Sequence, residues 1–181
     1  EVDGGSLELL DCILRTESTY GGTAMVIEEG NLIGRGLDLR LGARGDETGI
    51  LLRGKSSIEL SEAALVGTRE TKNGNTTLIQ SGPGGSVSVS NTGISTGGGR
   101  ESRGIDCTGS SLVLKAVEID SGGGTSESTG VRVSRSEAFL ENCTLTGREG
   151  SALTFAVKSF DSSLTLESSL IRLGADIGAN G

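Results

Sequence analysis

The sequence predicts an all-β protein that folds as a parallel β-helix, a β-solenoid of about seven coils with three short strands in each coil. The first observation is composition: the 181 residues include 31 Gly and a single Pro. Glycine suits turns, whereas proline cannot donate to a strand ladder, so this balance is typical of a turn-rich β protein. The other two observations are a repeated apolar pattern and its nearly constant interval.

The pattern is clearest in the stretch SLVLKAVEI, Ser111–Ile119. Its apolar residues are Leu112, Leu114, Val117 and Ile119, which form two alternating pairs with one residue too many between them for a single strand. Side chains alternate between the two faces of a strand, so such a slip in phase predicts a bend between two short strands.

The same template recurs along the chain. Its first positions are residues 7, 32, 58, 87, 112, 138 and 164, so the intervals are 25, 26, 29, 25, 26 and 26 residues. The other matching sets are Leu7/Leu9/Cys12/Leu14, Leu32/Gly34/Leu37/Leu39, Ile58/Leu60/Ala63/Leu65, Val87/Val89/Thr92/Ile94, Ala138/Leu140/Cys143/Leu145 and Leu164/Leu166/Ser169/Ile171. Strand-type pieces repeating at this interval predict coils of about 26 residues whose strands pair with those of the next coil.

Bends and a third strand complete each predicted coil. Residue types that tolerate the left-handed conformation stand at four bends, Asp11, Gly36, Asn91 and Asn142. Apolar pairs ahead of the template predict the third strand: Ile50/Leu52, Ile105/Cys107, Val131/Val133 and, with weaker alternation, Ala24/Val26 and Leu153/Phe155. Each coil is therefore expected to run strand, turn, strand, bend, strand, loop.

Residues 1–181 are expected to form a single β-helix domain, because the repeat leaves no room for a second one. The first residue is Glu1 rather than Met, so we expect an excised or processed part of a longer protein. The formal net charge is −8, and no basic cluster with interleaved aromatic residues occurs, which disfavours nucleic acid as a partner. No apolar run is long enough to cross a bilayer.

The three cysteines are expected to be unpaired. Cys12 and Cys143 hold the same template column five coils apart, which at about 4.8 Å per coil separates them by about 24 Å, beyond disulfide reach. Cys107 belongs to a different column. We therefore interpret all three as small buried apolar residues rather than as reactive or metal-binding thiols.

The loops between coils form one candidate ligand surface. They leave from the same point of each template and are therefore expected to project from one edge of the rod, where a ligand could bind. The charged residues that we select there are Arg44, Asp46, Arg69, Arg100, Arg103 and Arg148. The alternative interpretation is a solvated turn face without a ligand.

A second candidate surface is a small apolar patch. Val113 and Phe139 occupy the same outward position on successive coils. The patch is expected either to lie under a long loop or to contact another chain. Both ends of the solenoid are expected to expose core and unpaired strand edges, so we predict a protein partner or self-association through the open coil ends.

The stretch GVRVSRSEAFLENCTLTG, Gly130–Gly147, resembles the right-handed parallel β-helix repeats of the pectate-lyase-like superfamily, as found in bacterial secreted and surface proteins. This resemblance implies a right-handed coil and an extracellular or cell-surface location. The amphipathic N-terminal capping helix that such proteins usually carry is missing from the sequence.

The expected function is that of a non-enzymatic structural or adhesive module. The chain has no Trp and no His, one Tyr and three Phe, so aromatic platforms for a polysaccharide and the common nucleophile and base arrangements are lacking. We predict no catalytic, cofactor-binding or metal-binding residues and no cofactor. The alternative left open is a β-helix protein that binds or degrades polysaccharide, as a lyase or a glycoside hydrolase does.

Overall fold

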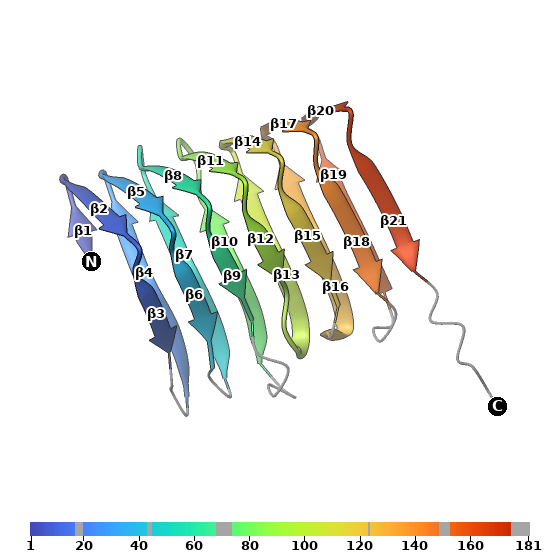
Figure 1. Cartoon of the computed structure of the whole chain (residues 1–181), viewed down its shortest axis with the longest axis horizontal. Coiled ribbons are helices and arrows are strands. Elements are labelled where there is room, and N and C mark those ends of the chain that lie inside the picture. Colours follow the sequence, from blue (N-terminus) through green and yellow to red (C-terminus); the bar gives the residue numbers. More distant parts are fainter. Residues whose placement is uncertain (17–19, 43–44, 68–73, 123, 149–152, 175–181) are drawn as a thin grey trace.

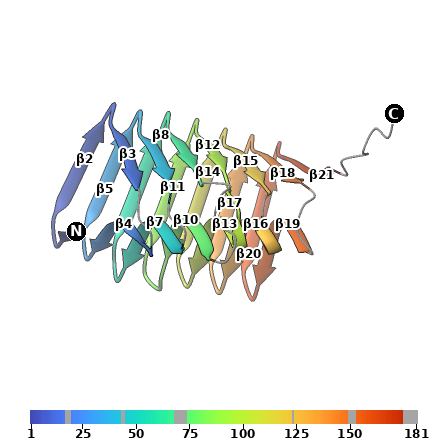
Figure 2. The ribbon, with the colours of Figure 1, turned by 90° about the horizontal axis from the view of Figure 1, so that it is seen from below.

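The structure, a computed structural model, is a right-handed β-solenoid built from three parallel sheets, which confirms the predicted fold class. The nearer strands in Figure 1 run downward and the farther strands run upward while the chain advances from left to right, which makes the coil right-handed. Figure 2 shows the same coils from below. The structure describes residues 1–16, 20–42, 45–67, 74–122, 124–148 and 153–174.

Each coil contributes one strand to each of three seven-stranded sheets, which we name A, B and C in chain order. Sheet A contains β1 (Val2–Asp3), β4 (Gly21–Glu28), β7 (Asp46–Arg53), β10 (Asn75–Ser81), β13 (Gly99–Thr108), β16 (Gly124–Ser134) and β19 (Leu153–Phe160). Sheet B contains β2 (Ser6–Leu10), β5 (Asn31–Arg35), β8 (Ser57–Ser61), β11 (Ser86–Ser90), β14 (Ser111–Lys115), β17 (Glu137–Glu141) and β20 (Ser163–Glu167). Sheet C contains β3 (Ile13–Thr16), β6 (Asp38–Leu41), β9 (Ala64–Val66), β12 (Gly93–Ser95), β15 (Glu118–Ser121), β18 (Thr144–Arg148) and β21 (Leu170–Gly174).

The four template columns form the core. Leu112 of β14 pairs with Val87 of β11 on one side and with Ala138 of β17 on the other, which is the register that the template predicts. The template residues of this coil are almost completely buried, with exposed fractions of 0 to 1% for Leu112, Leu114, Val117 and Ile119. Each apolar side chain therefore packs on its counterparts in the coils above and below.

The bend between sheets B and C has the left-handed conformation in every coil. Its φ angles lie between 46° and 64° at Asp11, Gly36, Glu62, Asn91, Ala116, Asn142 and Ser168. The four predicted residues are thus confirmed, and three others share their conformation. The bend amides still donate to the next coil, for example from Asn91 to the Lys115 carbonyl at 3.0 Å and from Ala116 to the Glu141 carbonyl at 2.9 Å.

A second left-handed column, which the sequence did not predict, forms the corner between sheets A and B. Its φ angles lie between 47° and 83° at Gly4, Glu29, Gly54, Gly84, Gly109, Arg135 and Asp161. Here too the ladder continues: the amide of Gly109 donates to the Ser134 carbonyl at 2.8 Å, and that of Arg135 donates to Phe160 at 3.0 Å. Two of the three corners are therefore turns that keep their hydrogen bonds.

Sheet A slips in phase along each strand, and this corrects two of the predicted apolar pairs. In β4 the residues that face the core are Met25 and Ile27, not the predicted Ala24 and Val26. Met25 pairs with Ile50 of β7, and Ile27 pairs with Leu52. In β19 Leu153 is exposed, and Val157 pairs with the buried Val131 of β16. The alternation of inward and outward side chains starts again after the slip. Counting every second residue from the loop therefore does not identify the side chains that face the core.

Glycine at the slip has a steric reason. A Cβ added to Gly104 would lie 2.5 Å from the carbonyl oxygen of Gly130 in the next coil, and one added to Gly130 would lie 2.6 Å from that of Ala156. Contacts this short are essentially never seen for Cβ atoms, so these two positions favour glycine because the backbones approach closely.

The outermost coils are less buried than the middle ones. Strands β2 and β20 each pair on one side only within the described sheet. Leu7 and Leu9 are accordingly only partly buried, while Leu166 and Ile171 are each 43% exposed. No described segment forms a helix with the length and apolar character needed to cross a membrane.

Replacing Ala116 by glycine is expected to stabilise the protein. Ala116 has a φ of 52°, where a Cβ costs about 1–2 kcal/mol. Glycine removes this strain but loses more entropy on folding, so we expect a net gain of about 0.5–1 kcal/mol and a rise in Tm of roughly 2–3 °C in thermal unfolding. As a control, Ala138→Gly in β17 should lower Tm. A lower Tm for Ala116→Gly would contradict the strain at this corner.

Candidate functional site

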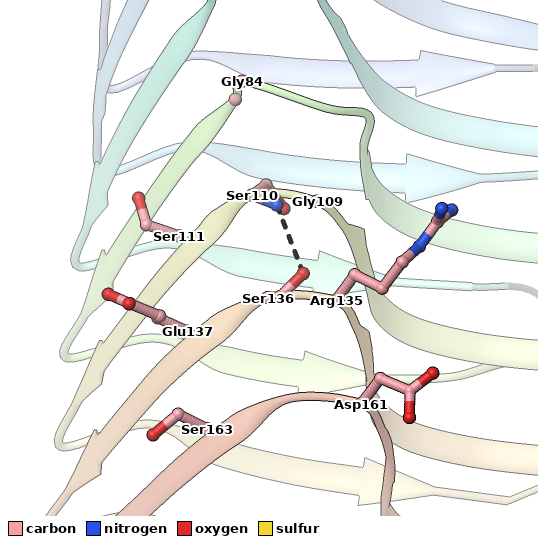
Figure 3. Close-up of a pocket in the computed structure, with 10 residues that line it drawn as sticks. Gly84, Gly109, Ser110, Ser111, Arg135, Ser136, Glu137, Asp161 and Ser163 are labelled. Carbon is pink, nitrogen blue, oxygen red and sulfur yellow. Dashed lines mark hydrogen bonds between the residues drawn. The ribbon is translucent and has the colours of Figure 1, made fainter.

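A groove at the corner between sheets A and B is the larger of two neighbouring concavities on the rod. It has a volume of about 580 Å³ and crosses four coils (Figure 3). Its lining residues are Gly84, Gly85, Gly109, Ser110, Ser111, Arg135, Ser136, Glu137, Asp161 and Ser163. We call this concavity the corner groove.

The turn around Pro83 helps to make the corner hollow here. The chain uses one residue more between β10 and β11 than between β13 and β14, because Ser81 pairs with Cys107 whereas Val87 pairs with Leu112. The amide of Gly84 in this turn donates to the Gly109 carbonyl of the next coil at 2.9 Å. A Cβ added to Gly109 would lie 3.3 Å from Pro83, so this turn packs directly on Gly109. The turn forms a rim at one end of the groove, and the missing side chain of Gly109 leaves the space next to it open.

Serine hydroxyls replace strand hydrogen bonds along the floor of the corner groove. The Ser136 hydroxyl accepts a hydrogen bond from the Ser110 amide at 3.2 Å and donates to the Ser134 carbonyl at 2.8 Å. One coil further, the Ser162 hydroxyl accepts from the Ser136 amide at 3.1 Å. These hydroxyls are engaged in joining coils, so we assign the floor a structural role.

The walls of the groove carry the groups that a ligand could contact. Figure 3 shows Arg135 and Asp161 on one side and Ser111, Glu137 and Ser163 on the other. Within the described part of the chain, Arg135, Glu137 and Asp161 take part in no ion pair, and no three acidic or cysteine side chains gather as a metal-binding group. The groove therefore offers hydrogen bonds and opposite charges for recognition.

The predicted patch of Val113 and Phe139 lies beside the corner groove. The two residues are direct neighbours on β14 and β17, and both are partly buried. They line a second concavity of about 240 Å³, together with Ser111, Leu112, Glu137, Ala138, Ser163 and Thr165. Ser111, Glu137 and Ser163 border both concavities, so the apolar patch and the corner groove form one continuous surface.

The charged residues predicted on loops have different surroundings. Arg100 and Arg103 lie in β13, because sheet A strands extend into the segments that the sequence suggested were loops. Asp46 begins β7, and its carboxylate accepts a hydrogen bond from the Asn75 amide at 2.7 Å. Arg148 ends β18. Arg44 and Arg69 lie outside the described residues, and a ligand role for this whole set stays a prediction.

A network of ion pairs on the outer face of sheet A was not predicted. Asp106 is only 5% exposed, and its carboxylate forms ion pairs with the guanidinium groups of Arg132 at 3.0 Å and Arg103 at 3.4 Å. Asp106 and Arg132 are opposite each other in the register of β13 and β16. Their 26-residue separation in the sequence was the available signal, because outward residues one repeat apart stand side by side.

Aromatic rings extend this network to the next coil. The Lys158 ammonium lies 2.7 Å from the Glu127 carboxylate and 4.7 Å from the centre of the Phe155 ring. The Arg132 guanidinium lies 5.9 Å from the ring centre of Phe160. Burial acts to raise the pKa of Glu127, but hydrogen bonds from Lys158 and Thr129 hold this pKa below its usual range. Cations and carboxylates thus join three successive coils.

The cysteines are unpaired, as predicted. Burial raises the pKa of the Cys107 thiol to about 12 and also raises that of Cys143. Cys12 differs because it lies in the first coil, where it is only partly buried. The interpretation as small core residues is confirmed for Cys107 and Cys143, and it holds less completely for Cys12.

Comparison of the sequence with known protein families and with curated proteins finds no match.

Thiol labelling is expected to separate the three cysteines. At pH 8 a thiol reagent should modify Cys12 in the folded protein, because this residue is only partly buried. Cys107 and Cys143 should react only after denaturation, since burial and raised pKa values keep their thiols neutral. The measurement is the mass of the labelled protein over time. A Cys12→Ser control should show no early labelling, and early modification of Cys107 would contradict the packing of sheet A.

Proposed function

We propose that the chain is a non-enzymatic structural module, a stiff β-helix rod of a secreted or cell-surface protein that mediates assembly or contacts with partner proteins. As a finer assignment, we propose a relationship to the pectate-lyase-like superfamily of the bacterial secreted or surface type. The observation that supports the structural role is that charged side chains on the outer surface form ion pairs with side chains of the neighbouring coil.

Several outward charged residues bind a residue of the neighbouring coil. Lys115 of β14 lies 3.1 Å from Glu141 of β17, and Arg132 of β16 lies 3.0 Å from Asp106 of β13. Lys158 of β19 in turn binds Glu127 of β16 at 2.7 Å. Single exposed pairs contribute little, but a connected network that includes a buried carboxylate resists sliding and bending of one coil on the next. This supports a role as a spacer of defined shape.

The faces of the outermost coils support the assembly part of the proposal. Strands β1, β2 and β3 pair on one side only in the described sheets, as do β19, β20 and β21. Leu166 and Ile171 add half-exposed apolar surface to the face of the last coil. Unpaired parallel strands with apolar neighbours are templates for strand addition, so a further coil would satisfy them.

The saccharide-binding alternative has less support from the geometry. The guanidinium of Arg103 donates a hydrogen bond to Glu101 and lies 3.4 Å from the carboxylate of Asp106. The guanidinium of Arg100 lies 3.8 Å from the carboxylate of Glu101. A saccharide at this surface would have to compete with these ion pairs. Oligosaccharide binding that disappears when Arg100 and Arg103 are replaced would nevertheless favour this alternative.

Light scattering across a series from micromolar to millimolar protein tests the assembly. We expect the molar mass to grow with concentration, because stacking of coil faces buries apolar surface. Leu166→Lys should suppress this growth, since it places a charge on the face of the last coil. The matched control is Leu170→Lys, because Leu170 has the same exposed fraction of 43% but lies on the outer side of sheet C. A monomeric mass throughout the series would overturn the assembly role.

A further inference from the structure

Phe139 stands on the outer face of sheet B between two carboxylates of its own strand. Glu137 and Glu141 are two residues before and two residues after it in β17, so their side chains leave the same face about 7 Å to either side. Val113 of β14 and Thr165 of β20 are its neighbours across the sheet. An aromatic ring is therefore surrounded by acidic and small side chains.

The two carboxylates differ in how they are paired. Glu141 lies 3.1 Å from Lys115. Glu137 faces Ser111 on one side and Ser163 on the other, and no described cation lies within ion-pair distance of it. Glu137 also borders both the corner groove and the concavity over Phe139, so its carboxylate is accessible from either space.

The same chain shows which group completes such an arrangement. On sheet A, Lys158 lies 2.7 Å from Glu127 and 4.7 Å from the centre of Phe155, so a carboxylate and a ring hold one cation between them. On sheet B the carboxylate of Glu137 and the ring of Phe139 are present, and this chain supplies no described cation to them. A cation over an aromatic face is attracted by the quadrupole of the ring, and an adjacent carboxylate adds a charge-assisted hydrogen bond.

We propose that the concavity over Val113 and Phe139 binds an arginine side chain of a partner protein. The aliphatic stem lies on Val113, the guanidinium stacks on the ring of Phe139, and its N–H groups donate to Glu137. Arginine fits better than lysine because its planar guanidinium can stack and form two hydrogen bonds at once. A concavity of about 240 Å³ accommodates one such side chain.

The charge of the whole chain supports a basic partner. The formal net charge is −8, and in the adjoining groove the carboxylates of Glu137 and Asp161 outnumber the single cation, Arg135. Such a field speeds the encounter with a positively charged surface and disfavours an acidic one. The inference rests on the partner-contact role proposed above and adds the chemistry of the partner.

An NMR titration with a small probe pair tests the site. The probe is Nα-acetyl-arginine methylamide, and its control is the citrulline analogue, which has nearly the same shape and no charge. We expect saturable shifts of the Val113, Glu137 and Phe139 amides with the arginine probe, at millimolar affinity because one side chain makes few contacts. The citrulline probe should bind at least about fivefold more weakly than the arginine probe, since it lacks the cation.

Two matched variants distinguish this site from general attraction to an acidic protein. Glu137→Gln should weaken the arginine probe about fivefold, whereas Glu141→Gln should leave its affinity unchanged, because Glu141 already binds Lys115. Phe139→Leu keeps an apolar side chain but removes the ring, and it should weaken binding to a similar degree. Unchanged β-sheet circular dichroism and Tm verify that each variant is folded.

Equal binding of the citrulline and arginine probes would overturn the proposal, because the concavity would then be a plain apolar contact. Equal effects of Glu137→Gln and Glu141→Gln would also overturn it, since binding would then reflect the acidic surface as a whole. The outcome of the probe titration does not depend on the outcome of the light-scattering series. A protein that stays monomeric and still binds the arginine probe would refute assembly through the coil faces and leave this site intact.

Discussion

The parallel hydrogen-bond ladder does not stop at two of the three corners, and the rest of the rod depends on this continuity. At both corners the chain changes direction at a residue with a left-handed backbone, as at Ala116 and Arg135. In that conformation their amides still reach the carbonyls of Glu141 and Phe160 in the next coil. The corners therefore fix the register of the sheets that they join, and the template columns stack in consequence.

The third corner, between sheets C and A, is built differently. Its connections vary in length, and side-chain hydroxyls inside the rod take over part of the bonding there. The Thr96 hydroxyl donates to the Gly122 carbonyl and also accepts from the Gly122 amide, both at 3.0 Å, and the Ser121 hydroxyl donates to Thr146 at 3.1 Å. Polar residues can occupy the interior at this corner because backbone groups near the loops need partners.

The sequence was sufficient for the repeat, the coil length and the bend between sheets B and C, because each of these is repeated along the chain. It was insufficient for the second left-handed corner, where Glu29, Arg135 and Asp161 occupy positions that glycine occupies in other coils. Residue type alone does not reveal a conformation that the neighbouring ladders impose. The slip in phase within sheet A had the same effect on the apolar pairs of β4 and β19.

The candidate site was predictable only in part. Val113 and Phe139 were paired correctly because they share a column, whereas the corner groove depends on the Pro83 turn lying against Gly109 of the next coil. The charges of Arg100 and Arg103 were predicted on loops, but they lie in a strand whose length depends on pairing with its neighbours. Contacts between coils at irregular positions have no signature within a single repeat.

Amide hydrogen exchange measures whether the hydrogen-bond ladder continues around the corners. If the ladder continues around the corners, the amides of Asn91, Ala116 and Arg135 will exchange as slowly as strand amides in the same coils, because opening any of them requires separating neighbouring coils. If these amides exchange as fast as those of an exposed turn while the neighbouring strands stay protected, the ladder does not continue around the corners.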